Sequence, residues 1–172
     1  KKVIAPNGER ILLHASNFRK IKRVQDVVKI FAEVNKQVPS KLLFIGDGPE
    51  RSTAEDLARE LGVSDEIRFV GKQEQMEDIL AIGDLFLLTS EYESFGLAAL
   101  EAMAAGVPVI STNAGGLGEI NIPGETGYMS EVGDVATMSQ QALSILKDDA
   151  ILFGFKERAA KHAQKFDINN II

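Results

Sequence analysis

Residues 85–110 read LFLLTSEYESFGLAALEAMAAGVPVI, which is an apolar run, a polar loop, a helical segment and a second apolar run. The apolar runs, 85–88 and 107–110, are continuous rather than alternating, a pattern typical of strands buried on both faces of a parallel sheet. The segment 97–105 between them predicts a helix. A strand, a helix and a strand in this order form a right-handed βαβ unit.

The same alternation continues outside this unit. In residues 23–38, apolar side chains recur at the i, i+3, i+4, i+7 spacing of a helix with one buried stripe. The other predicted strands are 11–15, 42–45 and 67–70, the other helices are 49–62, 76–82, 135–147 and 151–165, and residues 113–116 and 123–128 are predicted to be loop and turn. We therefore predict an α/β fold, a doubly wound parallel sheet with helices on both faces.

Length and composition favour one cytoplasmic domain. A chain of 172 residues that is 45% hydrophobic and 26% charged can bury a sizeable core, so residues 1–172 are predicted to form a single domain. The absence of cysteine excludes disulfides and thiolate metal sites and fits a reducing cytoplasm. No apolar run approaches the roughly 20 residues that span a bilayer, and residues 1–7 lack the apolar segment of a signal peptide. We expect a soluble protein.

The net charge argues against one class of partner, and the two chain ends indicate a longer protein. A formal net charge of −6 argues against a general nucleic-acid binder, because such proteins are usually basic, so any anion site must be local. The chain begins without methionine and its last helix lacks a stop signal. We therefore expect it to be a piece of a larger protein.

A basic loop follows the first predicted strand. Residues 19–23 hold four cations, Arg19, Lys20, Lys22 and Arg23, at the start of a predicted helix. Cations there oppose the helix dipole by a few tenths to about 1 kcal/mol each, so a bound anion would explain the placement. A solvated basic turn is the alternative.

Glycines follow the second predicted strand. Gly46 and Gly48 would let the backbone approach a ligand, or would simply make a tight turn. No Gly-x-Gly-x-x-Gly follows the first strand, which argues against a dehydrogenase-type dinucleotide site. The glycine-rich loop 113–119 has the same two interpretations, approach to a ligand or reversal of the chain.

Two glutamates flank the start of the helix in 85–110. Glu101 lies in the middle of an almost wholly apolar helix, which predicts burial nearly all round and the need for a partner. The free N–H groups around Gly96 and Leu97 could hold a phosphate, with Glu93 on one side and Glu101 on the other. That geometry suits a sugar nucleotide.

Other interpretations of these glutamates stay open. Glu101 could form an internal ion pair with Lys22 or Arg19, and Glu93 could complement the helix dipole. A glycosidase with the two glutamates as acid and nucleophile fits poorly, because tryptophan is absent and only 6% of residues are aromatic.

Metal and histidine chemistry are not indicated. His14 and His162 lack a nearby pattern of carboxylate and nucleophile, so both are interpreted as packed or surface residues. Metal-ligand spacing and an Asp-x-Asp pair are both absent, so no metal and no cofactor are predicted. Arg19 and Lys22 would neutralise a diphosphate themselves.

Residues 10–165 resemble, in order and spacing, the C-terminal domain of the retaining glycosyltransferases of family 4, which have the two-domain GT-B fold. The elements that carry the resemblance are Gly46-Asp47-Gly48-Pro49, Phe69-Val70-Gly71, the span from Glu93 to Glu101 with Phe95-Gly96 inside it, and Ala104-Ala105-Gly106-Val107-Pro108-Val109. The resemblance implies the Rossmann-like half of a GT-B enzyme that binds a nucleotide sugar.

The resemblance also implies site roles. Glu93 would contact hydroxyls of the donor sugar, Glu101 the ribose hydroxyls and Lys22 the phosphates. Backbone groups of Phe95, Gly96 and Leu97 would meet the diphosphate and sugar, and those of Val70, Gly71 and Lys72 the base. Asn17 stands where most of the family has an arginine, and Arg19 is the expected substitute.

Residues 16–28 are similar to one branch of the family, which joins N-acetylglucosamine from a UDP donor to L-malate in bacillithiol biosynthesis. The branch implies a UDP-sugar and the chain's own N-terminal acceptor domain as partners, retention of configuration, inactivity of the isolated half, and leaves a homo-oligomer open. The alternatives are another donor or acceptor such as a lipid-linked sugar or polysaccharide, a non-catalytic nucleotide-binding module, and a structural domain without a ligand.

Overall fold

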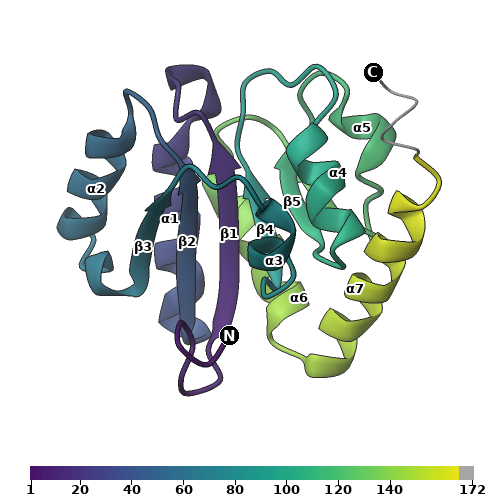
Figure 1. Ribbon diagram of the computed structural model, residues 1–172, viewed down its shortest axis with the longest axis horizontal. Helices are drawn as coiled ribbons and strands as arrows, with labels where there is room; N and C mark the ends of the chain where they lie inside the picture. Colours follow the sequence, from purple (N-terminus) through teal and green to yellow (C-terminus); the bar gives the residue numbers. More distant parts are fainter. Residues whose placement is uncertain (167–172) are drawn as a thin grey trace.

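The computed structural model describes residues 1–166, which form a six-stranded parallel sheet in the order β3-β2-β1-β4-β5-β6 (Figure 1). The strands are β1 (Arg10–Ser16), β2 (Ser40–Gly46), β3 (Ile67–Gly71), β4 (Leu85–Leu88), β5 (Val109–Thr112) and β6 (Gly127–Ser130). All strand pairs are parallel, so the carboxyl ends of the strands share one edge of the sheet. The predicted parallel α/β architecture is confirmed.

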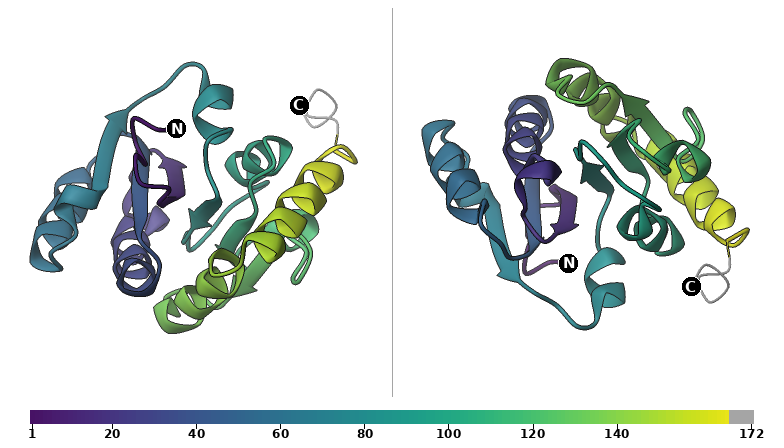
Figure 2. Two further views of the ribbon diagram at one scale, coloured as in Figure 1. Left: turned by 90° about the horizontal axis from the view of Figure 1, so that it is seen from below. Right: turned by 90° about the horizontal axis from the view of Figure 1, so that it is seen from above.

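Helices cover both faces of the sheet, as the views along the strands show (Figure 2). The helices are α1 (Val24–Gln37), α2 (Arg51–Glu60), α3 (Met76–Leu80), α4 (Leu97–Ala104), α5 (Leu117–Ile120), α6 (Val135–Leu146) and α7 (Asp149–Ala163), with 3-10 turns η1 (Lys20–Lys22) and η2 (Ser64–Glu66). Buried residues of α1, α2 and α6 pack on one face, those of α3, α4 and α5 on the other, and α7 contributes to both.

Strand residues alternate between these two cores. Leu12 belongs to the core beneath α1, whereas Leu13 belongs to the core beneath α4, and both are fully buried. Strand β4 is buried on both faces in the same way, which explains its continuous apolar sequence.

One strand was missed by the sequence prediction. Residues 127–130, expected to lie in or beside a turn, pair with β5 at the edge of the sheet. The side-chain nitrogen of Asn121, which is fully buried, donates to the Val109 carbonyl at 3.2 Å and to the Tyr128 carbonyl at 3.1 Å. A strand of four residues beside Gly and Pro turn signals is too short to show a period of its own, so long-range pairing decides it.

A buried carboxylate fastens α7 to the sheet. Asp84, whose exposed fraction is 3%, accepts the backbone N–H of Ile11 at 2.9 Å and the ammonium of Lys156 at 2.7 Å. This contact lies at the amino ends of β1 and β4, opposite the edge where the strand-to-helix loops gather.

The sheet reverses its winding between β1 and β4. The chain passes from β1 to β2 and β3 on one side, and then crosses to place β4 on the other side of β1. In open α/β sheets, ligands bind outside the carboxyl ends of the strands at such a switch point. None of the helices within residues 1–166 combines the length and apolarity needed to cross a membrane. The cytoplasmic location stays a prediction, as does the single-domain assignment.

Candidate functional site

The basic loop after β1 lies before helix α1 rather than in its first turn. Arg23, the N-cap of α1, has a left-handed φ of 50°, so the cations sit on the separate turn η1 and its flanks. Arg23 pairs with Asp26 at 2.7 Å and with Glu91 at 3.2 Å. Arg19 and Lys20 are exposed, so the interpretation as a solvated turn describes only these two cations.

Lys22 meets Glu93 across the switch point. The Lys22 ammonium lies 2.7 Å from Glu93 Oε1, and their side chains are 20% and 15% exposed. The Ser90 hydroxyl donates to the same oxygen at 2.8 Å. Partial burial weakens screening by salt, so the pair is a stronger contact than an exposed one.

Hydrogen bonds to backbone carbonyls hold the loops after β1 and β4 together. The Thr89 hydroxyl lies 2.8 Å from the Lys22 carbonyl and 2.9 Å from the Arg23 carbonyl, and the Glu91 N–H donates to the Ile21 carbonyl at 2.9 Å. Thr89 is fully buried, which shields these bonds from water. The cation and the carboxylate are therefore positioned by the backbone as well as by their own attraction.

The start of α4 lies next to Glu93. Gly96 caps the helix with a left-handed φ of 62°, and no side chain among residues 1–166 bonds to the first-turn N–H groups, so they can receive an anion. Phe95 and Leu97 on either side are 64% and 44% exposed. The start of α4 is therefore exposed beside Glu93, and its role in binding a phosphate stays a prediction.

Gly115 and Gly116 in loop 113–119 allow close packing against the loop after β4. The Gly116 N–H donates to the Glu93 carbonyl at 2.9 Å. A Cβ at Gly115, whose φ is 54°, would lie 1.9 Å from the same carbonyl oxygen. The loop supports the segment that carries Glu93.

Gly46 and Gly48 have a similar role on the other side. A Cβ at Gly46 would lie 1.9 Å from the Ser16 carbonyl oxygen, and one at Gly48 1.9 Å from the Asn17 carbonyl oxygen. These glycines let the loop after β2 pack against the exposed residue Asn17 and its neighbours.

Glu101 is half-buried rather than buried all round. The opposite face of α4 is the buried one, and Glu101 lines a pocket of about 440 Å³ between α3 and α4 together with Glu77. Burial, and next the charge of Glu77, raise the pKa of Glu101. Within residues 1–166 it forms no salt bridge, so the suggested ion pair with Lys22 or Arg19 is wrong.

The predicted base-binding segment lies at the end of β3. Val70 and Gly71 are half-buried, Lys72 is exposed, and the Val70 carbonyl accepts the side-chain amide of Gln73 at 2.7 Å. The next element is α3, which lines the Glu101 pocket. The predicted site segments, which follow β1, β2, β3, β4 and β5, thus lie along one edge of the sheet.

A family model described as glycosyl transferases group 1 matches residues 1–166. The chain belongs to this family. It is 51% identical over 152 residues to the N-acetyl-alpha-D-glucosaminyl L-malate synthase of Bacillus anthracis. The matched region covers 88% of this chain and 40% of the relative. The chain therefore spans less than half the length of that relative.

Solved structures share the fold. The structure of Anabaena Alr3699/HepE in complex with UDP superposes with a TM-score of 0.89 at 23% identity, over 99% of this chain and 48% of that one. The structure of a Staphylococcus aureus TarM mutant, also with UDP, gives a TM-score of 0.88 at 22% identity, over 95% of this chain and 34% of that one. The fold is the Rossmann-like half of a GT-B glycosyltransferase.

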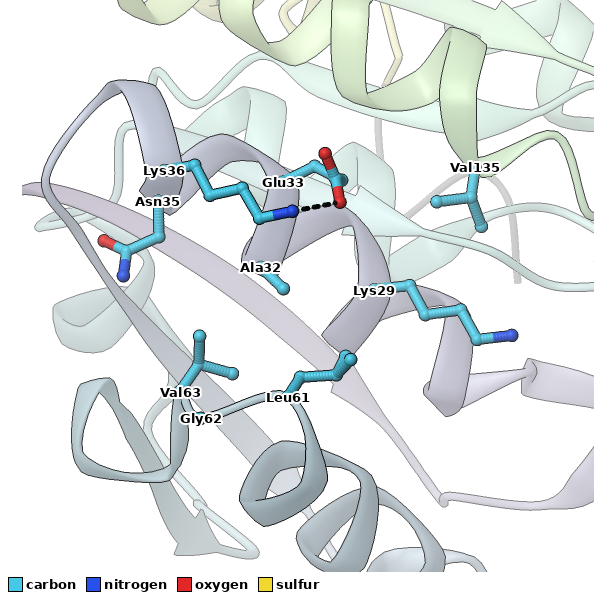
Figure 3. Close-up of a pocket in the computed structure, with 9 residues that line it drawn as sticks. All are labelled: Lys29, Ala32, Glu33, Asn35, Lys36, Leu61, Gly62, Val63 and Val135. Atoms are coloured by element: carbon cyan, nitrogen blue, oxygen red, sulfur yellow. Dashed lines mark hydrogen bonds and ion pairs between the residues drawn. The ribbon is translucent and has the colours of Figure 1, made fainter.

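Another pocket of this group 1 domain lies away from the switch point. It measures about 490 Å³ and lies beside α1 and the end of α2 (Figure 3). Lys36 pairs with Glu33 at 2.9 Å on its rim, while Leu61 and Val63 form part of its wall. None of the predicted site residues lines it, and it is not the candidate site.

Sequence reasoning missed the polar residues that hold the site together. Thr89, Ser90 and Ser16 each follow or end an apolar strand, which was the available signal. Their partners are distant in sequence and could not be paired from it. Within residues 1–166, no group of three or more His, Asp or Glu side chains could hold a metal ion. Independence from metal stays a prediction.

His14 is packed, as expected, but beneath this site. It is fully buried, and burial, the largest cause, lowers the pKa of its ring from 6.5 to about 4. Since the folded ring resists protonation while the unfolded ring does not, stability is present above pH 6.5 and is lost as the pH falls toward 4.

We expect this linkage to remove about 3 kcal/mol of unfolding free energy between pH 7 and pH 4, at about 1.36 kcal/mol per pKa unit. Urea unfolding at a series of pH values measures it. His14→Phe lacks the titrating group, so between pH 7 and pH 4 its unfolding free energy should fall by about 3 kcal/mol less than that of the wild-type protein. Equal losses in the two proteins would show that His14 does not stay neutral.

Proposed function

We propose that this chain is the donor-binding domain of a retaining glycosyltransferase that uses UDP-N-acetylglucosamine and transfers the sugar to L-malate. The observation that carries the proposal is the 51% identity to the Bacillus anthracis synthase, which spans 88% of the chain. Because the chain covers 40% of that relative, we assign the acceptor pocket to another domain, and we expect this half to be inactive alone.

The proposed donor lies along the carboxyl edge of the sheet. Lys22 and the free N–H groups at the start of α4 hold the diphosphate, and Glu93 accepts hydroxyl groups of the sugar. Glu101 accepts the ribose hydroxyls, and the segment 70–72 holds the base. Two solved structures of the same fold were determined in complex with UDP, which supports a uridine nucleotide.

Charge stabilisation is the chemistry that this half supplies. As the bond between the sugar and the diphosphate breaks, negative charge grows on the departing UDP. Lys22, the helix start and Arg19 in place of the usual arginine would stabilise that charge without a metal ion. No side chain of this half is required as a nucleophile, and closure against the acceptor domain would exclude water.

Calorimetric titration of the chain tests donor binding. UDP and UDP-N-acetylglucosamine are each titrated in EDTA and again in Mg²⁺, with GDP as the base control. We expect binding of both uridine ligands in EDTA and weaker binding of GDP. Binding that requires Mg²⁺ would contradict the metal-free site, and a folded chain that binds no nucleotide would contradict the donor-domain assignment.

A chimaera tests the sugar and the acceptor. This chain replaces the matching 152 residues of the Bacillus anthracis synthase, and the product is assayed with L-malate and several UDP-sugars. We expect transfer of N-acetylglucosamine, with the anomeric configuration of the donor retained in the product by NMR. Preference for another sugar, or UDP binding without transfer to any acceptor, would favour a different donor or a non-catalytic module.

A further inference from the structure

A buried histidine lies directly beneath the two loops of the site. His14, the fifth residue of β1, is fully buried among the rings of Phe18, Phe44 and Phe86, with centroid distances of 5.6–6.3 Å. The proposed chemistry does not use it. A buried imidazole among phenyl rings is costly unless both ring nitrogens have partners.

Both ring nitrogens form hydrogen bonds, and these bonds fix the tautomer of His14. Nδ1 lies 2.8 Å from the Leu87 carbonyl, which can only accept, so Nδ1 carries the hydrogen. Nε2 therefore accepts from the Ser16 hydroxyl, 2.8 Å away. The Ser16 oxygen in turn accepts the Phe18 N–H at 3.1 Å.

This series of hydrogen bonds ends at a strained bend of the backbone. Phe18 has a left-handed φ of 47°, a conformation that is strained for a residue other than glycine. The bend turns the chain from β1 into η1, which carries Lys22. The other end of the chain of bonds, Leu87, lies in β4, two residues before Thr89.

We propose that His14 is a positioning residue: through Ser16 it holds the bend at Phe18 and so places Lys22 against Glu93. Besides burial, the charge of Lys22 lowers the pKa of the His14 ring and the charge of Glu93 raises it. A neutral ring can accept the Ser16 hydrogen, whereas a protonated ring cannot. The consequence for phosphate binding rests on the proposed donor function, but the positioning itself does not.

Amide hydrogen exchange tests the positioning without a ligand. Ser16→Ala removes only the hydroxyl in the chain, and Ser144→Ala is the matched control on the exposed face of α6. We expect exchange at Phe18 and Glu91 to accelerate about 5-fold or more in Ser16→Ala, since a bond that holds the bend is lost. Exchange in β2 should match the control. Unchanged exchange at Phe18 and Glu91 would overturn the proposal.

A spectroscopic measurement tests the tautomer. Long-range proton–nitrogen NMR spectra of wild type should show the hydrogen of His14 on Nδ1 at pH 7. In Ser16→Ala, Nε2 loses its donor and its nitrogen shift should change while Nδ1 remains bonded. A hydrogen on Nε2 in the wild-type protein would overturn the chain of bonds.

Ligand binding separates positioning from general loosening. His14→Phe and Ser16→Ala should each weaken UDP about 5-fold or more, while uridine, which lacks the phosphates, should bind as to wild type. His14→Gln, whose amide can donate and accept, should recover part of the UDP affinity. Equal losses for UDP and uridine would overturn the proposal. If wild type binds neither ligand, the donor function fails, and amide exchange in His14→Phe, where Glu91 should accelerate as in Ser16→Ala, still decides the role of His14.

Discussion

Lys22→Ala is expected to weaken the binding of UDP about 10- to 100-fold, because a charge-assisted hydrogen bond to a phosphate contributes about 1.5–3 kcal/mol. Only 20% of the Lys22 side chain is exposed, so it loses little conformational freedom when it binds a diphosphate. Calorimetry on the chain in EDTA measures the loss.

Lys20→Ala is the matched control. It removes the same charge from an exposed side chain that lies two residues before Lys22. We expect a loss of about 3-fold or less, which should disappear at high salt because distant exposed charges are screened. Equal losses for the two variants would show that the loop acts through its net charge and that Lys22 has no particular contact.

Glu93→Gln gives the reciprocal result. Removing the carboxylate frees the Lys22 ammonium from its partner at 2.7 Å, so UDP should bind more tightly. UDP-N-acetylglucosamine should gain less, since Glu93 is the proposed acceptor for the sugar hydroxyls. Weaker UDP binding in this variant would argue that the Lys22–Glu93 pair is needed to build the phosphate site.

A large effect on stability at pH 7 is expected at Asp84. Asp84→Ala should lower the free energy of unfolding by about 3 kcal/mol, because it leaves the half-buried Lys156 ammonium and the Ile11 N–H without their partner. Urea unfolding at pH 7 measures the change. Affinity for UDP should stay near the wild-type value, since Asp84 lies at the opposite end of the strands from the site.

Asp149→Ala is the control for this prediction. Asp149 also forms an ion pair, with Arg10, but its side chain is 91% exposed. Such a pair contributes about 0–1 kcal/mol. A loss at Asp84 no greater than at Asp149 would show that the buried network does not hold α7 against the sheet.

Five strands and six of the helices could be predicted because each is encoded locally. Helix α1 shows the helical period over 14 residues, and β4 is a continuous apolar run. Strand β6 was missed because four residues between turn signals carry no local period. Its place depends on pairing with β5 and on the amide of Asn121.

The candidate site was predicted as residue types in loops, and not as contacts. The motif around Glu93 and Glu101 was visible because carboxylates interrupt an apolar helix and its entry. The alternative that Glu101 pairs with Lys22 or Arg19 was wrong, since only the tertiary structure shows that Glu101 lies beside α3. The tie between His14 and Ser16 was not visible, because a lone histidine in a strand looks like any packed residue.

Local patterns along the chain specify the alternation of strands and helices, the family, and which residue types stand in the loops after the strands. The tertiary structure alone decided that β1 and β4 are neighbours at the switch point, and therefore that Lys22 meets Glu93, 71 residues away. The physical reason is that periodicity reports which face of an element is buried, whereas a contact between distant loops depends on the order of strands in the sheet. That order is fixed by the packing of the whole core.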